Sequence, residues 1–305
     1  MILERGLFME VIRVEHLKKA YKEVLAVDDI SFRVEEGELF AFLGENGAGK
    51  STTINMLCTI LAKTDGEAVI CGHRLGEEDD AIREKIGIVF QNSVLDAKLT
   101  VKENLLLRGS YYGLKKKEIE ERLKGLGEHF EMDDIWNRRY EKLSGGQRRR
   151  VDIMRALVHQ PKILFLDEPT TGLDPKSRKL VWDYINHLRK DRGMTIFLTT
   201  HYMEETRDAD HVVILDKGKI ISQGTPAELK RQYTASRLIW YTAKQEAAET
   251  LLQDYSHTYD ADHYTVSFDG SITEFLYAHR DVITDYEIVK GTMDDVFLRL
   301  TGKEL

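Results

Sequence analysis

The sequence predicts an α/β protein built on a largely parallel sheet, followed by a smaller α+β unit. A continuous apolar run, residues 39–43, is typical of a strand buried on both faces. A glycine-rich loop follows at once, and the stretch after it, STTINMLCTIL, has helical spacing. Residues 162–167 and 195–199 are further apolar runs of the same kind. After residue 226 the pattern changes to shorter strands and helices that alternate.

Composition and charge describe an ordinary globular protein. The chain has 305 residues, enough for one large and one small domain, with 42% hydrophobic and 31% charged residues. Its 44 basic and 52 acidic residues give a net charge of −8, which argues against a protein whose main role is to coat nucleic acid. A membrane-spanning helix needs about 20 consecutive apolar residues, and runs such as residues 163–166 are far shorter. We expect no nucleic-acid partner and no intrinsic membrane segment.

The N-terminal region and the cysteines favour a cytoplasmic protein. Glu4 and Arg5 interrupt the region where a signal peptide would need apolar residues. A cleaner segment begins at Met9, so residues 1–8 are interpreted as an extension or an alternative start. Cys58 and Cys71 are the only cysteines of the sequence, and they do not have the spacing of a metal-binding pair. We expect two small buried thiols rather than a disulfide.

Changes of pattern divide the rest of the chain. Residues 96–142 are charged and of helical period, which predicts a helical subdomain, while Gly224 and Pro226 mark a boundary between domains of residues 9–225 and 226–305. In the first domain we expect strands at 11–17, 30–34 and 212–216 and helices at 101–112, 117–130 and 176–191. In the second we expect strands at 237–242, 263–268 and 282–289, helices at 244–254, 271–278 and 293–300, and a turn at Asp269-Gly270.

The glycine-rich loop matches the phosphate-binding pattern G-x-x-x-x-G-K-[ST]. Glycines let the backbone wrap around phosphates and aim N–H groups at them, and the helix that follows adds the positive end of its dipole. Lys50 places a charge against the β- and γ-phosphates, and the Ser51 hydroxyl can join a Mg²⁺ shell. The position between a strand and a helix favours this function over a simple glycine turn. The predicted nucleotide-binding residues are Gly44, Glu45, Asn46, Gly47, Ala48, Gly49, Lys50, Ser51 and Thr52.

An acidic pair ends the next buried strand. Residues 163–166 are apolar, Asp167 follows where the strand ends, and Glu168 comes next. Asp167 is suited to hold Mg²⁺, directly or through water, and Glu168 is suited to polarise an attacking water. An apolar strand that ends in an acid is common, so the pair gains its meaning from the phosphate loop upstream. We predict Asp167 as a metal ligand and Glu168 as the catalytic base.

The segment Leu143-Ser144-Gly145-Gly146-Gln147 carries the most specific signal. RRRVDIMRALVHQP follows it, so the Ser144 hydroxyl and the N–H groups of Gly145 and Gly146 lie at a helix start and form a second anion site. Here the sequence resembles the ATP-binding cassette family, over about residues 11–225. The resemblance implies a P-loop NTPase cassette with a mixed sheet, an antiparallel part and a helical subdomain. It also implies a head-to-tail dimer in which Ser144, Gly145, Gly146 and Gln147 of one copy close over the ATP of the other.

The remaining landmarks of that family are present in order. By the resemblance, Tyr21 stacks on adenine and Gln91 senses Mg²⁺ and the attacking water, on the loop that faces the transporter. Asp174 links the two nucleotide sites across the dimer, and His201 contacts the γ-phosphate. A lone tyrosine or histidine would more often be structural, and the order of the motifs favours the functional interpretation. The predicted catalytic residues are Glu168, His201, Gln91 and Lys50, and the predicted metal ligands are Ser51, Gln91 and Asp167.

Two segments indicate a branch of the family. Residues 96–105 and the stretch at 293–302 resemble the drug- and antibiotic-exporter branch, the second of them its short accessory domain. The resemblance implies export through separate membrane permease subunits, with this chain peripheral to the inner face of the membrane. The resemblance also implies that the membrane subunits largely choose the transported molecule. The arginines after the signature, Arg148, Arg149 and Arg150, are expected to be partly solvated helix positions.

Three other classes fit less well. A soluble cassette ATPase that acts on ribosomes or DNA usually carries two cassettes, a long coiled-coil insertion or zinc cysteines. This chain has one cassette, and Lys50 and Ser144 are only 94 positions apart (144 − 50). A P-loop small-molecule kinase leaves residues 143–147 unexplained, and a regulatory module without hydrolysis has no need of Glu168.

Overall fold

The computed structural model describes residues 9–130, 132, 134–268 and 271–302. The chain divides into two compact units, Met1–Gln223 and Gly224–Leu305. The expected turn at Asp269-Gly270 and the extension before Met9 lie outside the described residues. Within the described ranges, no helix combines the length and the apolar character that crossing a membrane requires.

Two sheets form the frame of the first unit. The larger has the strand order β10-β9-β3-β8-β7-β6, and its strands from β9 to β6 run parallel. They are β3 (Leu39–Leu43), β6 (Ile86–Val89), β7 (Ile163–Asp167), β8 (Thr195–Thr200), β9 (His211–Asp216) and β10 (Lys219–Gly224). The smaller sheet is antiparallel, in the order β2-β1-β4-β5, with β1 (Glu10–Tyr21), β2 (Val24–Glu35), β4 (Asp65–Ile70) and β5 (His73–Arg74). The predicted mixed sheet with an antiparallel part is confirmed.

An aromatic core joins the two sheets. The ring of Phe32 on β2 lies 5.3 Å from Phe40 and 4.9 Å from Phe42 of β3, between centroids. Phe197 of β8 lies 5.0 Å from Phe42, and Phe165 of β7 lies 5.2 Å from Phe197. Every residue of β3 is buried, as its continuous apolar run predicts. The loop that leaves β3 therefore starts from a rigid part of the core.

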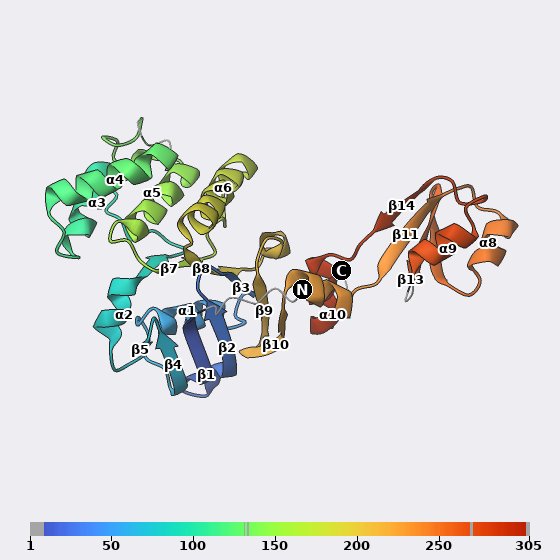
Figure 1. The fold of residues 1–305 in the computed structure, drawn as a ribbon, viewed down its shortest axis with the longest axis horizontal. Coiled ribbons are helices and arrows are strands. Elements are labelled where there is room, and N and C mark those ends of the chain that lie inside the picture. The colour runs from blue at the N-terminus through green and yellow to red at the C-terminus, as the bar shows by residue number, and fades with distance from the viewer. Residues whose placement is uncertain (1–8, 131, 133, 269–270, 303–305) are drawn as a thin grey trace, which may run out of the picture. The chain divides into compact units, whose positions relative to one another are not determined.

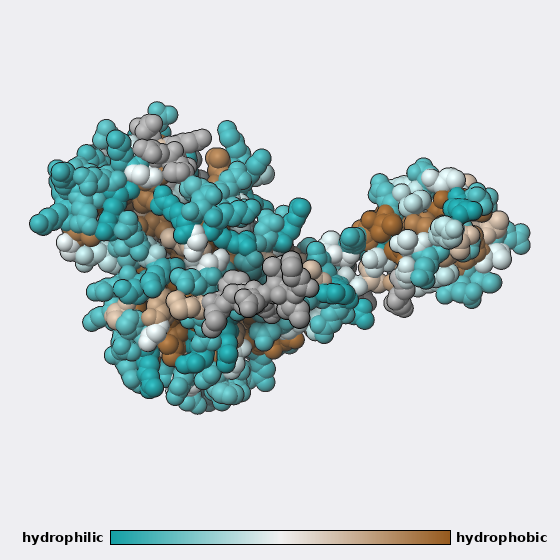
Figure 2. Space-filling model, viewed as in Figure 1, coloured by the Kyte–Doolittle hydropathy of each residue, from teal (hydrophilic) through white to brown (hydrophobic). Residues whose placement is uncertain are grey.

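The helices of the first unit fall into two groups. Figure 1 shows α3, α4, α5 and α6 gathered on one side of β3 and β8, with the antiparallel sheet on the other. The elements of this unit outside its sheets are α1 (Lys50–Leu57), α2 (Asp79–Lys85), α3 (Val101–Ser110), α4 (Lys116–Phe130), η1 (Tyr140–Lys142), α5 (Gly145–Leu157), α6 (Pro175–Arg192) and η2 (Met203–Thr206). Capping explains where several begin: Thr100 and Glu103 form a capping box for α3, and Pro175 is the first residue of α6. Figure 2 shows that the visible face of this unit is mostly hydrophilic.

The second unit is an α+β region, as predicted. Its antiparallel sheet has the order β12-β13-β11-β14, and Trp240, Tyr264 and Phe275 are buried in its core. Helices α7 and α10 pack against each other. The elements are α7 (Pro226–Tyr233), β11 (Ser236–Tyr241), α8 (Glu246–Leu252), β12 (Ser256–Asp260), β13 (His263–Phe268), α9 (Ile272–Ala278), β14 (Tyr286–Val289) and α10 (Met293–Thr301).

Several local predictions were wrong. The expected strand at 282–289 is only β14, Tyr286–Val289, and the expected helix at 244–254 is only α8. Strand β12 was missed because its sequence, SHTYD, has a single aromatic residue and lies at a sheet edge. Strand β4 was missed because it begins with Asp65-Gly66, which is typical of a turn. Cys58 is buried and Cys71 is half-buried, and both are free thiols.

Candidate nucleotide-binding and catalytic site

The glycine-rich loop turns tightly between β3 and α1. A Cβ at Gly44 would lie 2.6 Å from the carbonyl oxygen of Leu215, and one at Gly49 would lie 2.6 Å from that of Ala26. Gly49 caps α1 with a φ of 105°, a left-handed conformation that favours glycine. Gly47 also has a left-handed φ, 85°, but nothing lies within 4 Å of its Cβ position. The loop is packed at both ends and open at its tip, where Glu45, Asn46 and Gly47 are exposed.

The Lys50 ammonium lies inside the loop that carries it. The residue is only 4% exposed, and its Nζ donates to the carbonyls of Gly44 and Glu45 at 2.6 and 3.0 Å. Burial lowers the pKa of Lys50, and the carboxylates of Glu168 and Asp167 act against that shift. The loop thus presents a largely desolvated cation, to which an anion would bind strongly.

Asp167 gathers two hydroxyl groups at the carboxyl end of β7. The Ser51 Oγ donates to Asp167 Oδ1 at 3.1 Å, and the Thr199 Oγ1 donates to the same oxygen at 2.5 Å. Strands β7 and β8 are neighbours and parallel, so both side chains reach the same sheet edge. The described residues contain no group of three or more His, Cys, Asp or Glu side chains that would form a protein metal cage. Two oxygen donors beside a phosphate loop fit Mg²⁺, which binds few protein ligands and keeps waters or phosphate oxygens.

Glu168 is the point where three predicted catalytic residues meet. Its Oε2 accepts from Gln91 Nε2 at 3.1 Å and from Thr171 Oγ1 at 3.2 Å. Its Oε1 lies 3.7 Å from Lys50 Nζ and 3.2 Å from His201 Nδ1. The side chain is buried, and the backbone has a φ of 46°, which is unusual for a residue other than glycine. Four side chains from different elements thus surround the Glu168 carboxylate.

His201 is held by a stack of side chains that the sequence did not indicate. Its Nδ1 is close to Glu168 but not aligned for a hydrogen bond. The Tyr202 ring lies 4.1 Å from the His201 ring, and the Arg178 guanidinium lies 4.9 Å above the Tyr202 ring. Arg178 comes from α6, which begins one turn earlier at the predicted Asp174. The stack therefore connects His201 to the start of α6.

The signature segment forms the start of α5. Ser144 caps this helix: its Oγ accepts from Gln147 N at 3.3 Å, and Gln147 Oε1 accepts from Ser144 N at 2.9 Å. Gly146 is buried against α6, where a Cβ would lie 2.7 Å from that of Ser177. Ser144 and Gly145 are exposed. The exposed groups at this helix start are thus Ser144 and Gly145, while the Gln147 side chain serves the cap.

Asp174 and Tyr21 lie outside the cluster around Glu168. Asp174 caps α6 and accepts from Ser177 N at 3.0 Å and from Ser177 Oγ at 2.6 Å, and these bonds lower its pKa. Tyr21 ends β1 with 45% of its surface exposed, and the Lys19 ammonium lies 5.1 Å from its ring centroid. One copy of the chain therefore brings together the phosphate loop, Gln91, Asp167, Glu168 and His201, and leaves Tyr21, Ser144, Gly145 and Asp174 on exposed surface.

The prediction that all three signature arginines are partly solvated was wrong for Arg149. Arg148 is exposed and Arg150 is half-buried, but Arg149 is 6% exposed. Its position on α5 explains the difference, because it lies three residues after buried Gly146 and four before buried Ile153. This helical spacing could have indicated that Arg149 is buried, but the run of three arginines suggested a solvated surface instead.

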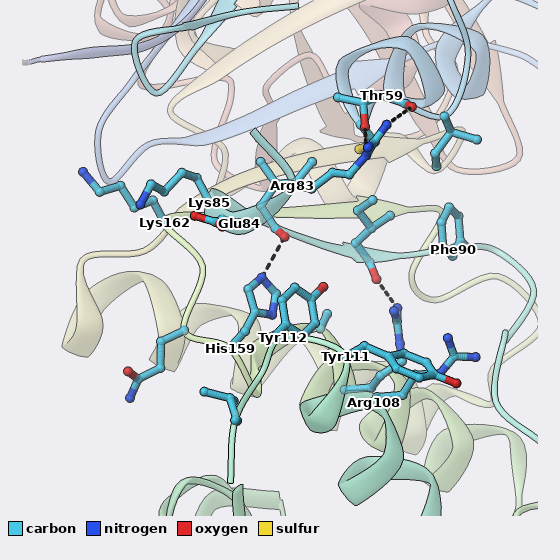
Figure 3. Close-up of a pocket in the computed structure, with 18 of the residues that line it drawn as sticks. Thr59, Arg83, Glu84, Lys85, Phe90, Arg108, Tyr111, Tyr112, His159 and Lys162 are labelled. Atoms are coloured by element: carbon cyan, nitrogen blue, oxygen red, sulfur yellow. Dashed lines mark hydrogen bonds between the residues drawn. The ribbon is translucent and has the colours of Figure 1, made fainter. Parts of the chain in front are cut away.

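A groove of about 810 Å³ opens beside the Gln91 loop (Figure 3). Phe90 lines it, together with the cations Arg83, Lys85, Arg108, Arg122, Arg155 and Lys162 and a single acid, Glu84. The ring of His159 stacks on Tyr112 at 3.9 Å, and burial lowers the His159 pKa to about 4, so it is neutral at pH 7. Figure 3 shows Lys85 and Lys162 near each other, in agreement with the backbone hydrogen bond from Lys162 N to Lys85 O. The groove is cationic on balance, with Arg83 paired to Asp80 and Arg122 paired to Glu118.

Sequence comparison places this geometry among known proteins. A family model described as ABC transporter matches residues 27–171. The Nod factor export ATP-binding protein I of Ralstonia nicotianae is 36% identical over 305 residues, which is 97% of this chain and 95% of that protein. The daunorubicin/doxorubicin resistance ATP-binding protein DrrA of Streptomyces peucetius is also 36% identical, over 95% of this chain and 92% of its own.

Solved structures with the same fold cover about 70% of the chain. CbiO1 from Clostridium perfringens, part of the ABC transporter complex cbiONQ, aligns with a TM-score of 0.66 at 30% identity, over 72% of this chain and 90% of its own. The ATP-binding cassette MJ0796, in a dimeric post-hydrolysis state bound to ADP and Pi, aligns with a TM-score of 0.65 at 28% identity, over 70% of this chain and 98% of its own.

Proposed function

The chain belongs to the ABC transporter family as the ATP-hydrolysing subunit of an exporter, and from this premise we propose that two copies bind two ATP molecules head to tail. Each phosphate loop is then closed by Ser144, Gly145 and Gly146 of the other copy. The exposed start of α5 supports this, because Ser144 and Gly145 lie on the surface where the positive end of the helix dipole would face an anion. The dimeric state described for the MJ0796 cassette supports it too.

The observation that carries the proposal is the convergence on Glu168. Its carboxylate receives the Gln91 amide at 3.1 Å and has Lys50 and His201 within 3.7 Å. Glu168 orients and polarises the attacking water, and Gln91, whose amide donates to the same carboxylate, helps to position it. Lys50 and His201 stabilise the charge of the γ-phosphate as it is transferred. This division of work needs no covalent intermediate.

Ser51 and Asp167 are the residues that would hold Mg²⁺, with Gln91 as a further ligand. Their oxygens already meet at 3.1 Å, and Thr199 fixes the Asp167 carboxylate. When bound, the ion neutralises negative charge on the β- and γ-phosphates. Tyr21, exposed at the end of β1, stacks on adenine, and Asp174 at the start of α6 links the two nucleotide sites across the dimer.

The cationic groove is the surface that we assign to the membrane permease subunits. Phe90 lines the groove and Gln91 follows it in the chain, so a permease segment seated there would touch the loop that holds the catalytic glutamine. This places the subunit at the inner face of the cell membrane, held through its permease. The relatives named for Nod factor export and for drug resistance support an export direction.

Glu168→Gln tests the proposal. The substitution keeps size and hydrogen bonding but removes the basic carboxylate, so ATP should bind while hydrolysis falls by roughly 10²–10⁴-fold. The closed dimer should then accumulate and elute at doubled mass in size-exclusion chromatography with ATP and Mg²⁺. Lys50→Ala is the matched control, which should lose nucleotide affinity and stay monomeric. A Glu168→Gln protein that hydrolyses ATP at the unsubstituted rate would remove Glu168 from the mechanism.

A further inference from the structure

A buried guanidinium joins the segments that carry the catalytic residues. Arg149 of α5 donates to the carbonyl oxygen of Phe90 at 2.6 Å, of Gln91 at 3.3 Å and of Glu168 at 3.4 Å. Phe90 and Gln91 belong to the loop after β6, and Glu168 follows β7. One side chain therefore bridges the backbones of Gln91 and Glu168, whose side chains meet at 3.1 Å.

The next turn of α5 holds the other end of the same loop. Asp152 lies three residues after Arg149, is buried, and accepts from Ser93 Oγ at 2.6 Å and from Tyr140 OH at 3.1 Å. Ser93 comes two residues after Gln91. The helix thus holds the loop on both sides of Gln91, through Arg149 before and at it and through Asp152 after it.

The burial of Arg149 is too unfavourable to be incidental. Burial lowers its pKa, and the nearby charge of Asp152 acts against that shift. A buried charge is tolerated when hydrogen bonds replace its lost water, and here three backbone carbonyls do so. A planar fork of five N–H donors on three nitrogens can reach carbonyls that lie farther apart than the three donors on the single nitrogen of lysine can.

We propose that Arg149 is a positioning residue for ATP hydrolysis, which sets the separation between the Gln91 amide and the Glu168 carboxylate through its three backbone hydrogen bonds. The inference rests on the proposed function of Glu168. It requires that loss of the guanidinium slows the chemical step far more than it weakens nucleotide binding, because, among the described residues, all three hydrogen bonds of Arg149 go to backbone carbonyls outside the phosphate loop, and Asp167 interacts with Arg149 only through its charge.

Arg149→Met tests the inference in the full-length protein. A shift of about 1 Å in a catalytic group can lower a rate by about 10²-fold, so kcat should fall to that extent while KM and the Kd for ATP stay near their original values. Arg149→Lys, which keeps the charge and most of the volume, should restore only part of kcat. If either folded variant keeps the original kcat, the proposal is overturned.

Arg189 provides a matched control on the neighbouring helix α6. Its guanidinium also donates to a backbone carbonyl, that of Asp208 at 3.0 Å, and it lines neither the site around Glu168 nor the cationic groove. Arg189→Met should lower thermal stability, as Arg149→Met does, but should leave kcat close to that of the unsubstituted protein. An equal loss of kcat in both variants would show a general effect of helix packing and would contradict the proposal.

A double-mutant cycle separates this inference from the proposed function. If Arg149 acts through Glu168, adding Arg149→Met to Glu168→Gln should reduce the residual rate far less than it reduces the rate of the unsubstituted protein. Multiplicative losses would overturn the positioning role even where Glu168→Gln alone behaves as expected. A Glu168→Gln variant with full activity would instead refute the proposed function itself, whatever Arg149 does.

Discussion

Within the signature segment, residues 143–147, Gly146 has less room for an added side-chain atom than Gly145 has. An alanine Cβ at this position would lie 2.7 Å from the Ser177 Cβ and closer still to its Oγ. Ser177 cannot simply turn away, because its Oγ donates to Asp174 Oδ2 at 2.6 Å. Helices α5 and α6 would have to separate, and overpacking of this kind typically costs about 1–3 kcal/mol.

Gly145→Ala is the control that separates the cost of the collision from the gain in helix propensity that alanine brings. Both substitutions gain up to about 1 kcal/mol by replacing glycine within a helix. The Cβ of an alanine at position 145 would meet only the Leu173 Cδ2, at an ordinary 3.4 Å. Gly146→Ala should therefore be less stable than Gly145→Ala by about 1–3 kcal/mol. Chemical denaturation followed by circular dichroism measures this difference in the free energy of unfolding.

A compensating substitution at Ser177 tests whether the collision is the cause of the lost stability. Ser177→Gly removes both atoms that would collide with a residue-146 Cβ, and the next atom, the Ser177 Cα, lies 3.6 Å away. In the Ser177→Gly background, Gly146→Ala should then be neutral or stabilising. Equal stability of the two single alanine variants would refute the reasoning, and so would a Gly146→Ala penalty that persists when Ser177 is glycine.

Two further predictions concern pH and the second unit. Burial raises the pKa of Glu38 from 4.5 to about 7, with Asp210 and Glu35 adding to the rise, so the folded state binds more protons than the unfolded state in that range. The contribution of Glu38 to stability should therefore fall as pH rises from 4.5 to 7. Glu38→Gln should raise the unfolding temperature above pH 7 and change it little below pH 4.5, and a difference between the two proteins that does not vary with pH would contradict this. Deletion of residues 226–305 should leave ATP binding intact and weaken dimerisation or coupling to the permease, and a folded truncated protein with lower affinity for ATP would show the assignment to be wrong.

The sequence predicts those helices and strands whose signals lie within their own residues, as a hydrophobic pattern or a capping residue. Strand β3 follows from its unbroken apolar run, and the start of α6 follows from Asp174 and Pro175. It fails for β12, because a short edge strand is held by backbone bonds to β13 and needs little apolar sequence of its own. The phosphate loop, Asp167 and Glu168 could be proposed from the sequence because binding a nucleotide's phosphates and their metal ion calls for glycine, lysine and acidic residues in a recognisable order.

Some residues could not be identified from the sequence because they act through contacts that only the fold creates. Arg149 donates to carbonyl oxygens, and every residue has a carbonyl oxygen, so no partner motif exists to be recognised. Thr199 and Tyr202 likewise gain their roles from contacts with residues of other elements: Thr199 bonds Asp167 across neighbouring strands, and Tyr202 packs beneath Arg178 of α6. Their chemistry is ordinary, and only the fold brings them to the site.

Helix α5 connects the exposed signature segment to the loop that carries Gln91. Its first residues follow Ser144, which we assign to the ATP of the partner copy, and its next turns hold the Gln91 loop through Arg149 and Asp152. That loop borders the groove assigned to the permease. Because a helix of so few turns moves nearly as a rigid body, we expect a displacement at its start to reach the loop that carries Gln91. The same helix would therefore let the closing of the dimer and the state of the permease act on a single hydrogen bond, the one between Gln91 and Glu168.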